Sequence, residues 1–247
     1  KILKDKEIAI SKNLDKIEEL IKLETEYICV SVSSNKKMPI NSYFLKTSKD
    51  YIKDFYLFKR QISVDTNKCV DSLKKKYNND DDMKSILTAY ITSVCSSIVT
   101  FLFDNSPKVR VHFRKLIGDE YVRWVIVKYN KENGNLQTNY RSLNPIPIDT
   151  VNMIEESYRC KEPLIRSLNN EFHYKSKNST DTYEDYLTCS FSSFSKNNHP
   201  LLSFNISVAD AQILRTKLYV ICFFRLDVVL KEELKKIDNL IALEKLI

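Results

Sequence analysis

The stretch VRVHFRKLIGDEYVRWVIVKYN, residues 109–130, decides the fold class of this chain. Its first half alternates between apolar and polar residues with period two, as a β-strand with two different faces does. One face carries Val109, Val111 and Phe113, and the other carries Arg110, His112 and Arg114. The second half, residues 121–129, is apolar on both faces, which is typical of a central strand. The short linker Gly118-Asp119 joins the two halves, so the stretch predicts a β-hairpin.

A long buried helix is predicted in front of this hairpin. The segment SILTAYITSVCSSIVTFLF, from Ser85 to Phe103, is apolar with helical spacing, and Pro107 ends it. The polar run from Asn78 to Asp82 precedes the helix and is the best candidate for a domain boundary.

Residues 1–77 are expected to form a helical or mixed extension of the chain. An apolar stripe predicts a helix over Ile2–Glu24, and YICVSVS predicts a strand over Tyr27–Ser33. Two helices could follow, in SKDYIKDFYLFKR and in TNKCVDSLKKKY. The pattern leaves open whether this extension is a separate domain or is docked on the rest.

Behind the hairpin, Asn133-Gly134 predicts a second turn that leads into a strand at Leu136–Tyr140. A helix is expected over Asp149–Leu168, capped by Asp149 or Thr150, although Pro163 must end or kink it. A polar and mobile segment, Asn169–Glu184, is expected next.

The last third of the chain predicts three strands and a closing helix. The strands are expected at Tyr186–Phe194, Leu201–Val208 and Lys217–Leu226, and the helix at Asp227–Ile247. This order of elements predicts an α+β fold, with an antiparallel sheet of about six strands and helices on one side of it.

The order resembles the GAF domain family over residues 85–247. The segments that carry the resemblance are SILTAYITSVCSSIVTFLF, VRVHFRKLIGDEYVRWVIVKYN, DTVNMIEESYRCKEPLIRSLN, YLTCSFSSF with HPLLSFNISV, and LYVICFFRLDVVLKEELKKIDNLIALEKLI. The resemblance implies a sensory domain whose final strand runs into a signalling helix. The family's glycine before the fifth strand is replaced around Ala209–Ala211, and its NKXF[SD] motif for cyclic nucleotides is absent.

A basic row on the hairpin is the candidate ligand site. Arg110, His112 and Arg114 share one face of the first strand, and Arg123 lies on the adjoining strand. Arginine pairs with phosphate or carboxylate through two parallel hydrogen bonds, so this face would suit an anionic ligand. The alternative is the solvent-facing polar side of an edge strand. The resemblance, which places ligands between the sheet and the loop region, adds Tyr140, Arg141, Arg166 and Tyr183–Tyr186.

Several classes of protein are disfavoured by composition. Gly118 and Gly134 are the only glycines, so GxGxxG, GxxxxGK[ST] and GxSxG loops cannot occur. The three histidines are isolated and no paired carboxylates occur in an apolar context, which argues against an enzyme and against a metal site. Whether the chain has a cofactor is left open. The six cysteines form no CxxC pair, which favours buried thiols in a reducing cytoplasm. No uninterrupted apolar run reaches the roughly 18 residues of a membrane span.

The functional expectation is a cytoplasmic regulatory or sensory domain that binds a small ligand, for which an anion is the candidate. The apolar stripes Leu3–Ile21 and Leu230–Ile241 either pack on their own domain or join a second copy in a dimer that transmits the signal. A rival hypothesis is an interaction module without a ligand in a larger complex, for example in defence. A second rival is a basic nucleic-acid-binding protein, but the basic residues behind the net charge of +7 are scattered among acidic ones, which disfavours nucleic acid as a partner.

Overall fold

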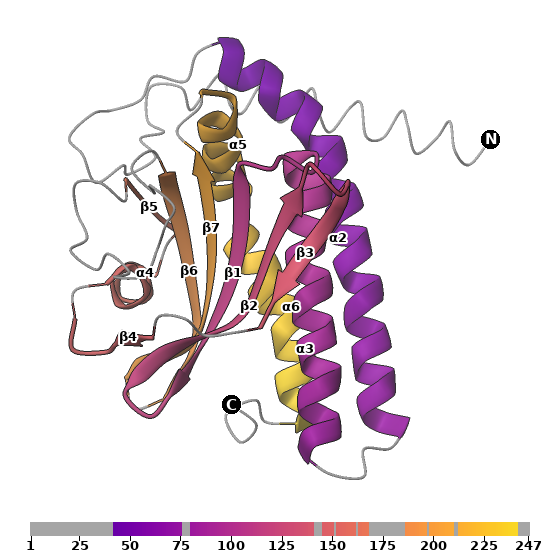
Figure 1. The fold of residues 1–247 in the computed structure, drawn as a ribbon, viewed down its shortest axis with the longest axis vertical. Helices are drawn as coiled ribbons and strands as arrows, with labels where there is room; N and C mark the ends of the chain where they lie inside the picture. The colour runs from indigo at the N-terminus through magenta and orange to yellow at the C-terminus, as the bar shows by residue number, and fades with distance from the viewer. Residues whose placement is uncertain are drawn as a thin grey trace.

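The computed structural model describes residues 42–75, 80–140, 145–150, 152–161, 163–167, 186–196, 198–209 and 212–241. The helix and strand expected within residues 2–33, and the polar segment 169–184, lie outside these residues. The described chain is α+β, with an antiparallel sheet and flanking helices (Figure 1), and this confirms the predicted fold class.

The sheet of the described residues has seven strands in the order β3-β2-β1-β7-β6-β5, with β4 paired to β2. Every pairing is antiparallel. The strands are β1 Val109–Ile117, β2 Glu120–Asn130, β3 Asn135–Asn139, β4 Ile146–Pro147, β5 Leu164–Ser167, β6 Tyr186–Lys196 and β7 His199–Ala209. Strand β1 is therefore central, with β2 on one side and β7 on the other.

The β1–β2 hairpin forms where the sequence predicts it. Ile117 lies opposite Glu120, so Gly118 and Asp119 make the turn. Gly118 has φ +56°, a left-handed conformation that residues with a Cβ adopt at a cost. The register shifts between Phe113 and Arg114, and Trp124 is the extra residue on β2, as in a β-bulge.

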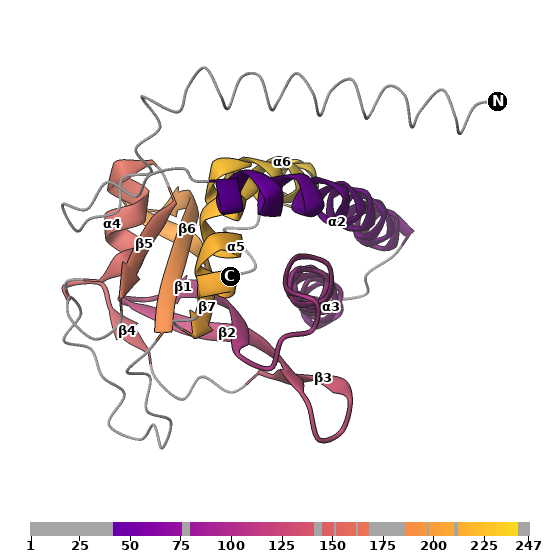
Figure 2. The same ribbon diagram turned by 90° about the horizontal axis from the view of Figure 1, so that it is seen from above.

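Four helices lie on one side of the sheet (Figure 2), and the first of them packs mainly on the other three. They are α2 Ser42–Lys75, α3 Asp80–Ser97, α5 Gln212–Phe223 and α6 Leu226–Ile241. Helix α3 continues as a π-helical turn, η1, over Ile98–Leu102. The shorter helix α4, Met153–Cys160, packs on β5, β6 and β7. The absence of a membrane span stays a prediction: by length and composition the run Asp80–Leu102 could cross a bilayer, but half of its apolar window is buried inside the fold.

Helix α2 is one continuous helix where the sequence suggested two. It packs against α3, α5 and α6, and its Phe58 and Ile62 are completely buried in the core that the sheet shares. The division into an extension of residues 1–77 and a domain of residues 85–247 stays a prediction. The described part of the extension is docked on the rest.

The strand expected at Lys217–Leu226 is wrong, because this segment forms most of α5. An apolar run such as LYVICFF fits a buried strand and a buried helix equally well. In the structure it is a helix between β7 and α2, and its Leu218, Val220 and Ile221 are completely buried. Arg225, with φ +54°, then separates α5 from α6.

The helix expected over Asp149–Leu168 is too long. Asn152, not Asp149 or Thr150, caps α4, since its side chain accepts hydrogen bonds from the backbone N–H groups of Ile154 and Glu155. The helix ends at Cys160, where Lys161 turns left-handed with φ +56°. Pro163 then excludes a further helical turn, and the residues after it form strand β5 on the edge of β6.

Candidate functional site

A row of polar side chains crosses the middle of the sheet on strands β1 and β7. Arg110 lies opposite Ser207, His112 opposite Asn205, and Arg114 opposite Ser203. We call these six residues the polar ladder. Side chains directly opposite each other in an antiparallel pair lie about 5 Å apart at Cβ, so the ladder forms one continuous surface.

The polar ladder faces away from helix α3. Phe113, between two ladder residues, packs edge-on against Trp124, and the indole Nε1 of Trp124 donates a hydrogen bond to Thr88 of α3 over 2.9 Å. Since successive strand residues point to opposite faces, His112 and Arg114 point to the other side of the sheet.

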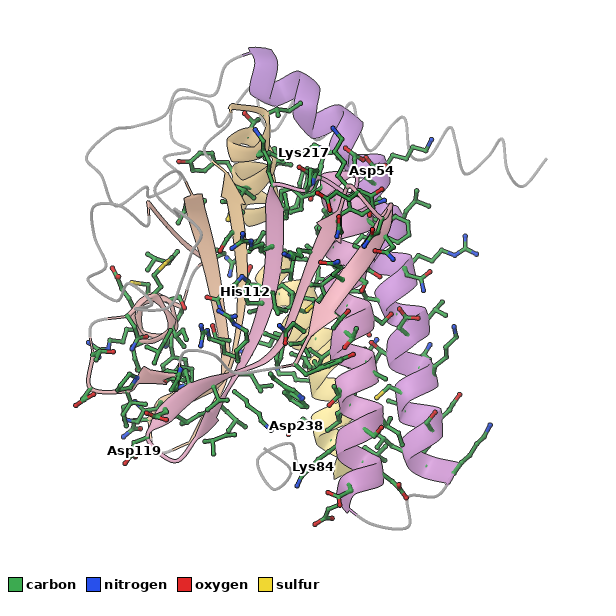
Figure 3. The ribbon with its side chains drawn as sticks, in the orientation of Figure 1. Asp54, Lys84, His112, Asp119, Lys217 and Asp238 are labelled. Atoms are coloured by element: carbon green, nitrogen blue, oxygen red, sulfur yellow. The ribbon has the colours of Figure 1, made fainter. Side chains whose placement is uncertain are left out.

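His112 lies at the centre of the ladder, midway along the sheet (Figure 3). Its side chain is nine-tenths buried, and its Nε2 atom has no hydrogen-bond partner among the described residues. Burial lowers its pKa well below 6.5, and the positive charges of Arg123, Arg114 and Arg110 lower the pKa further. The imidazole is therefore neutral at physiological pH.

The arginines of the basic row come together as the sequence predicts. Arg114 is 8% exposed, and its Nη1 donates a hydrogen bond to the carbonyl oxygen of Tyr121 over 3.1 Å. Arg123 lies directly opposite Arg114 on β2 and is half-buried, as is Arg110. The alternative of an exposed edge strand is wrong, because β1 pairs on both sides and two of its polar side chains are buried.

Of the residues that the family resemblance added, Tyr140 and the backbone of Arg166 lie apart from this cluster. Tyr140 is 55% exposed and its hydroxyl accepts a hydrogen bond from Thr92 of α3, on the helix side of the sheet. Arg166 belongs to β5, the third strand from β1 and about 14 Å away at the usual strand spacing of about 4.8 Å. Tyr186 starts β6 opposite Ala209. Arg141 and residues 183–185 lie outside the described residues.

A second buried polar cluster escaped prediction. The carboxylate of Glu155, on α4, accepts a hydrogen bond from the hydroxyl of Tyr121 and lies 2.7 Å from Nδ1 of His199. Glu155 is 5% exposed and Tyr121 is completely buried, and burial together with this hydrogen bond raises the pKa of Tyr121. The three residues come from β2, α4 and the start of β7, so no local pattern in the sequence links them.

Within the described ranges, no group of three or more His, Cys, Asp or Glu side chains could hold a metal ion. Cys69, Cys95 and Cys222 are buried free thiols, and Cys160 is an exposed one. Burial raises the pKa of Cys69 to about 11, so this thiol stays protonated and unreactive at neutral pH.

No protein-family model matches this chain, and no curated protein matches it. Among solved structures, the chain is similar to the GAF domain of A. aeolicus nlh2 in an inactive state, with 10% identity and a TM-score of 0.35. The match covers 72% of this chain and 98% of that one. At this TM-score and identity, the likeness assigns neither a family nor a function.

Proposed function

We propose that this chain is a regulatory, sensory-type domain that binds a small anion on the polar ladder and is not an enzyme. The observation that carries the proposal is the buried Nε2 of His112, which has no hydrogen-bond partner among the described residues. A buried polar atom normally has a partner, because leaving it unpaired costs about 1–3 kcal/mol. An anion oxygen that accepts a hydrogen bond from this imidazole would supply that partner.

The groups around His112 suit binding better than proton transfer. Arginine stays protonated at every physiological pH and offers five donors in a fixed fork that matches phosphate or carboxylate. Arg110, Arg114 and Arg123 all act electrostatically on His112, which places their charges close to it. The serines and Asn205 of β7 add neutral hydrogen-bonding groups along the same surface.

The position of the ladder supports a role in signalling. Strand β7 carries half of the ladder, and α5 begins three residues after β7 ends. Helix α5 packs on both β7 and α2, and α6 begins three residues after α5 ends. A ligand that shifted β7 would therefore act on the helices α5 and α6. The buried free thiols of Cys69, Cys95 and Cys222 agree with the reducing cytoplasm in which we place the domain.

Association of two copies is part of the proposal, and an interaction role without a ligand is its rival. Three large apolar side chains on α2 are exposed: Tyr56 at 58%, Leu57 at 42% and Val64 at 41%. Leu57 and Val64 are seven residues apart and share one stripe of the helix. Light scattering of Leu57→Glu and of the unaltered protein tests this surface: a dimer that dissociates in the variant supports it.

The ligand proposal is tested by thermal unfolding with inorganic phosphate, pyrophosphate, AMP, citrate and glutamate at constant ionic strength. A ligand at 100 times its dissociation constant stabilises the folded state by about 2.7 kcal/mol. We expect at least one of these anions to raise Tm, and Arg110→Gln to abolish the rise. Lys108→Gln is the matched control. It removes one positive charge, as Arg110→Gln does, at an exposed position just before β1. Failure of every anion, or an equal loss in the control, would contradict the proposal.

A further inference from the structure

A cavity of about 540 Å³ lies between α3, α6, strand β7 and the C-terminal end of α4. This volume is within the range of about 300–1,000 Å³ that small-molecule sites occupy. The floor of the cavity is apolar and deeply buried: Ile91, Val94, Phe113, Leu202, Phe204 and Leu234 are each no more than 7% exposed.

The mouth of the same cavity is basic. Four basic residues of its lining are exposed, and they come from the end of α4 and from the start of α6: Arg159, Lys161, Arg225 and Lys231. The described lining contains one acidic residue, Asp227, and Arg225 already binds it through hydrogen bonds of 3.0 and 2.9 Å. The mouth therefore keeps an excess of positive charge.

We propose that this cavity binds an anionic amphiphile with a single aliphatic chain, such as a fatty carboxylate. The buried apolar floor removes a hydrocarbon chain from water, and the basic mouth attracts the carboxylate at its end. A small anion would leave the apolar floor exposed, and a neutral apolar ligand would gain nothing from the basic mouth. None of the arginines of the polar ladder lines this cavity, so the two sites can be tested independently.

Trp124 offers a direct probe of this cavity, because it is the one tryptophan of the chain. Its ring lies 5.9 Å from that of Phe113, which lines the cavity floor. Dodecanoate, kept below its critical micelle concentration, is titrated into the protein while Trp124 emission and Tm are followed. We expect a saturable change in emission and a rise in Tm. Dodecyltrimethylammonium, with the same chain but a positive head, and acetate, with the head but no chain, are expected to produce neither.

The charge of the mouth is tested with a double variant, Arg159→Glu with Lys231→Glu. Both positions are exposed, so the fold should survive. Attraction becomes repulsion at two surface positions, and we expect dodecanoate affinity to fall about tenfold. The control is Lys235→Glu, an exposed residue of α6 outside the cavity lining, which should leave affinity within about twofold.

Three results would overturn the proposal. One is the absence of saturable dodecanoate binding, and another is equal binding of dodecyltrimethylammonium, which would reveal non-specific hydrophobic adsorption. The third is a double variant that loses no more affinity for dodecanoate than Lys235→Glu loses. A response to phosphate that is lost in Arg110→Gln, without any response to dodecanoate, would leave the proposed function standing while refuting this site.

Discussion

At the scale of single residues, His112 combines two properties that both act on its pKa. It is buried, and it is surrounded by positive charge from Arg110, Arg114 and Arg123. Each property favours the neutral imidazole, and a bound anion would favour the charged form. Protonation of His112 and anion binding are therefore expected to be coupled.

The first prediction concerns the pH dependence of stability. The pKa of His112 is low in the folded protein but near 6.5 in the unfolded chain, so below about pH 6.5 the unfolded chain binds a proton that the folded protein does not. His112 should therefore reduce the free energy of unfolding by up to about 1.4 kcal/mol for each pH unit below that value. The free energy of unfolding is measured by urea denaturation between about pH 5 and 8. Plotted against pH, it should fall less steeply toward low pH in His112→Leu than in the unaltered protein. The same dependence on pH in both proteins would contradict the lowered pKa of His112.

The second prediction concerns Glu155. Replacement by alanine leaves the buried hydroxyl of Tyr121 without its acceptor, which should lower the free energy of unfolding by about 1–3 kcal/mol. Glu155→Gln keeps an oxygen at the same position and should cost less. Urea denaturation measures both, with Asp149→Asn as an exposed control just before α4. A Glu155→Ala variant as stable as the control would show that the cluster contributes nothing to folding.

At the scale of elements, α6 decides between the two interpretations of the C-terminal apolar stripe. Leu230, Leu234 and Ile237 are each no more than 7% exposed and belong to the common core. In the described chain this seam packs on its own domain, so it is not an open surface for a second copy.

The third prediction follows from this packing. Leu234→Ala should cost about 2–5 kcal/mol of unfolding free energy, because it removes buried apolar contacts and enlarges the cavity that Leu234 lines. Its oligomeric state by light scattering should stay unchanged. Leu240→Ala, at a position 40% exposed on the same helix, should cost under about 1 kcal/mol. A Leu234→Ala variant that dissociates without loss of stability would contradict the inward packing of the seam.

The elements that the sequence predicted correctly are those with a strong local signal. The β1–β2 hairpin has alternation and a glycine turn, and the row Arg110, His112 and Arg114 follows from that alternation alone. The strand prediction for residues 217–226 was wrong, because a continuous apolar run has no periodicity that distinguishes a buried helix from a buried strand. The pair of Glu155 and His199, 44 residues apart, depends on how α4 docks near the start of β7, which no local pattern encodes.

At the scale of the whole molecule, the two faces of the sheet differ in chemistry. Helices α2, α3, α5 and α6 lie on one side of the sheet (Figures 1 and 2), and that face is buried in an apolar core. The opposite face carries the polar ladder. Strand β7 belongs to both, since Phe204 and Ile206 lie in the core and Ser203, Asn205 and Ser207 lie in the ladder. This arrangement joins the proposed anion site to the helical layer through one strand.

Anion binding at His112 is tested most directly by ¹⁵N magnetic resonance of the imidazole nitrogens. The method is practical because the chain has only three histidines. The signals of His112 are assigned by their loss in His112→Leu. In the free protein they should remain those of a neutral ring well below pH 6.5. Addition of the anion that raises Tm should shift the Nε2 signal of His112, and this shift should be absent in Arg110→Gln. Titration of His112 near pH 6.5 would contradict its lowered pKa. A stabilising anion that leaves the Nε2 signal of His112 unchanged would contradict anion binding at the polar ladder.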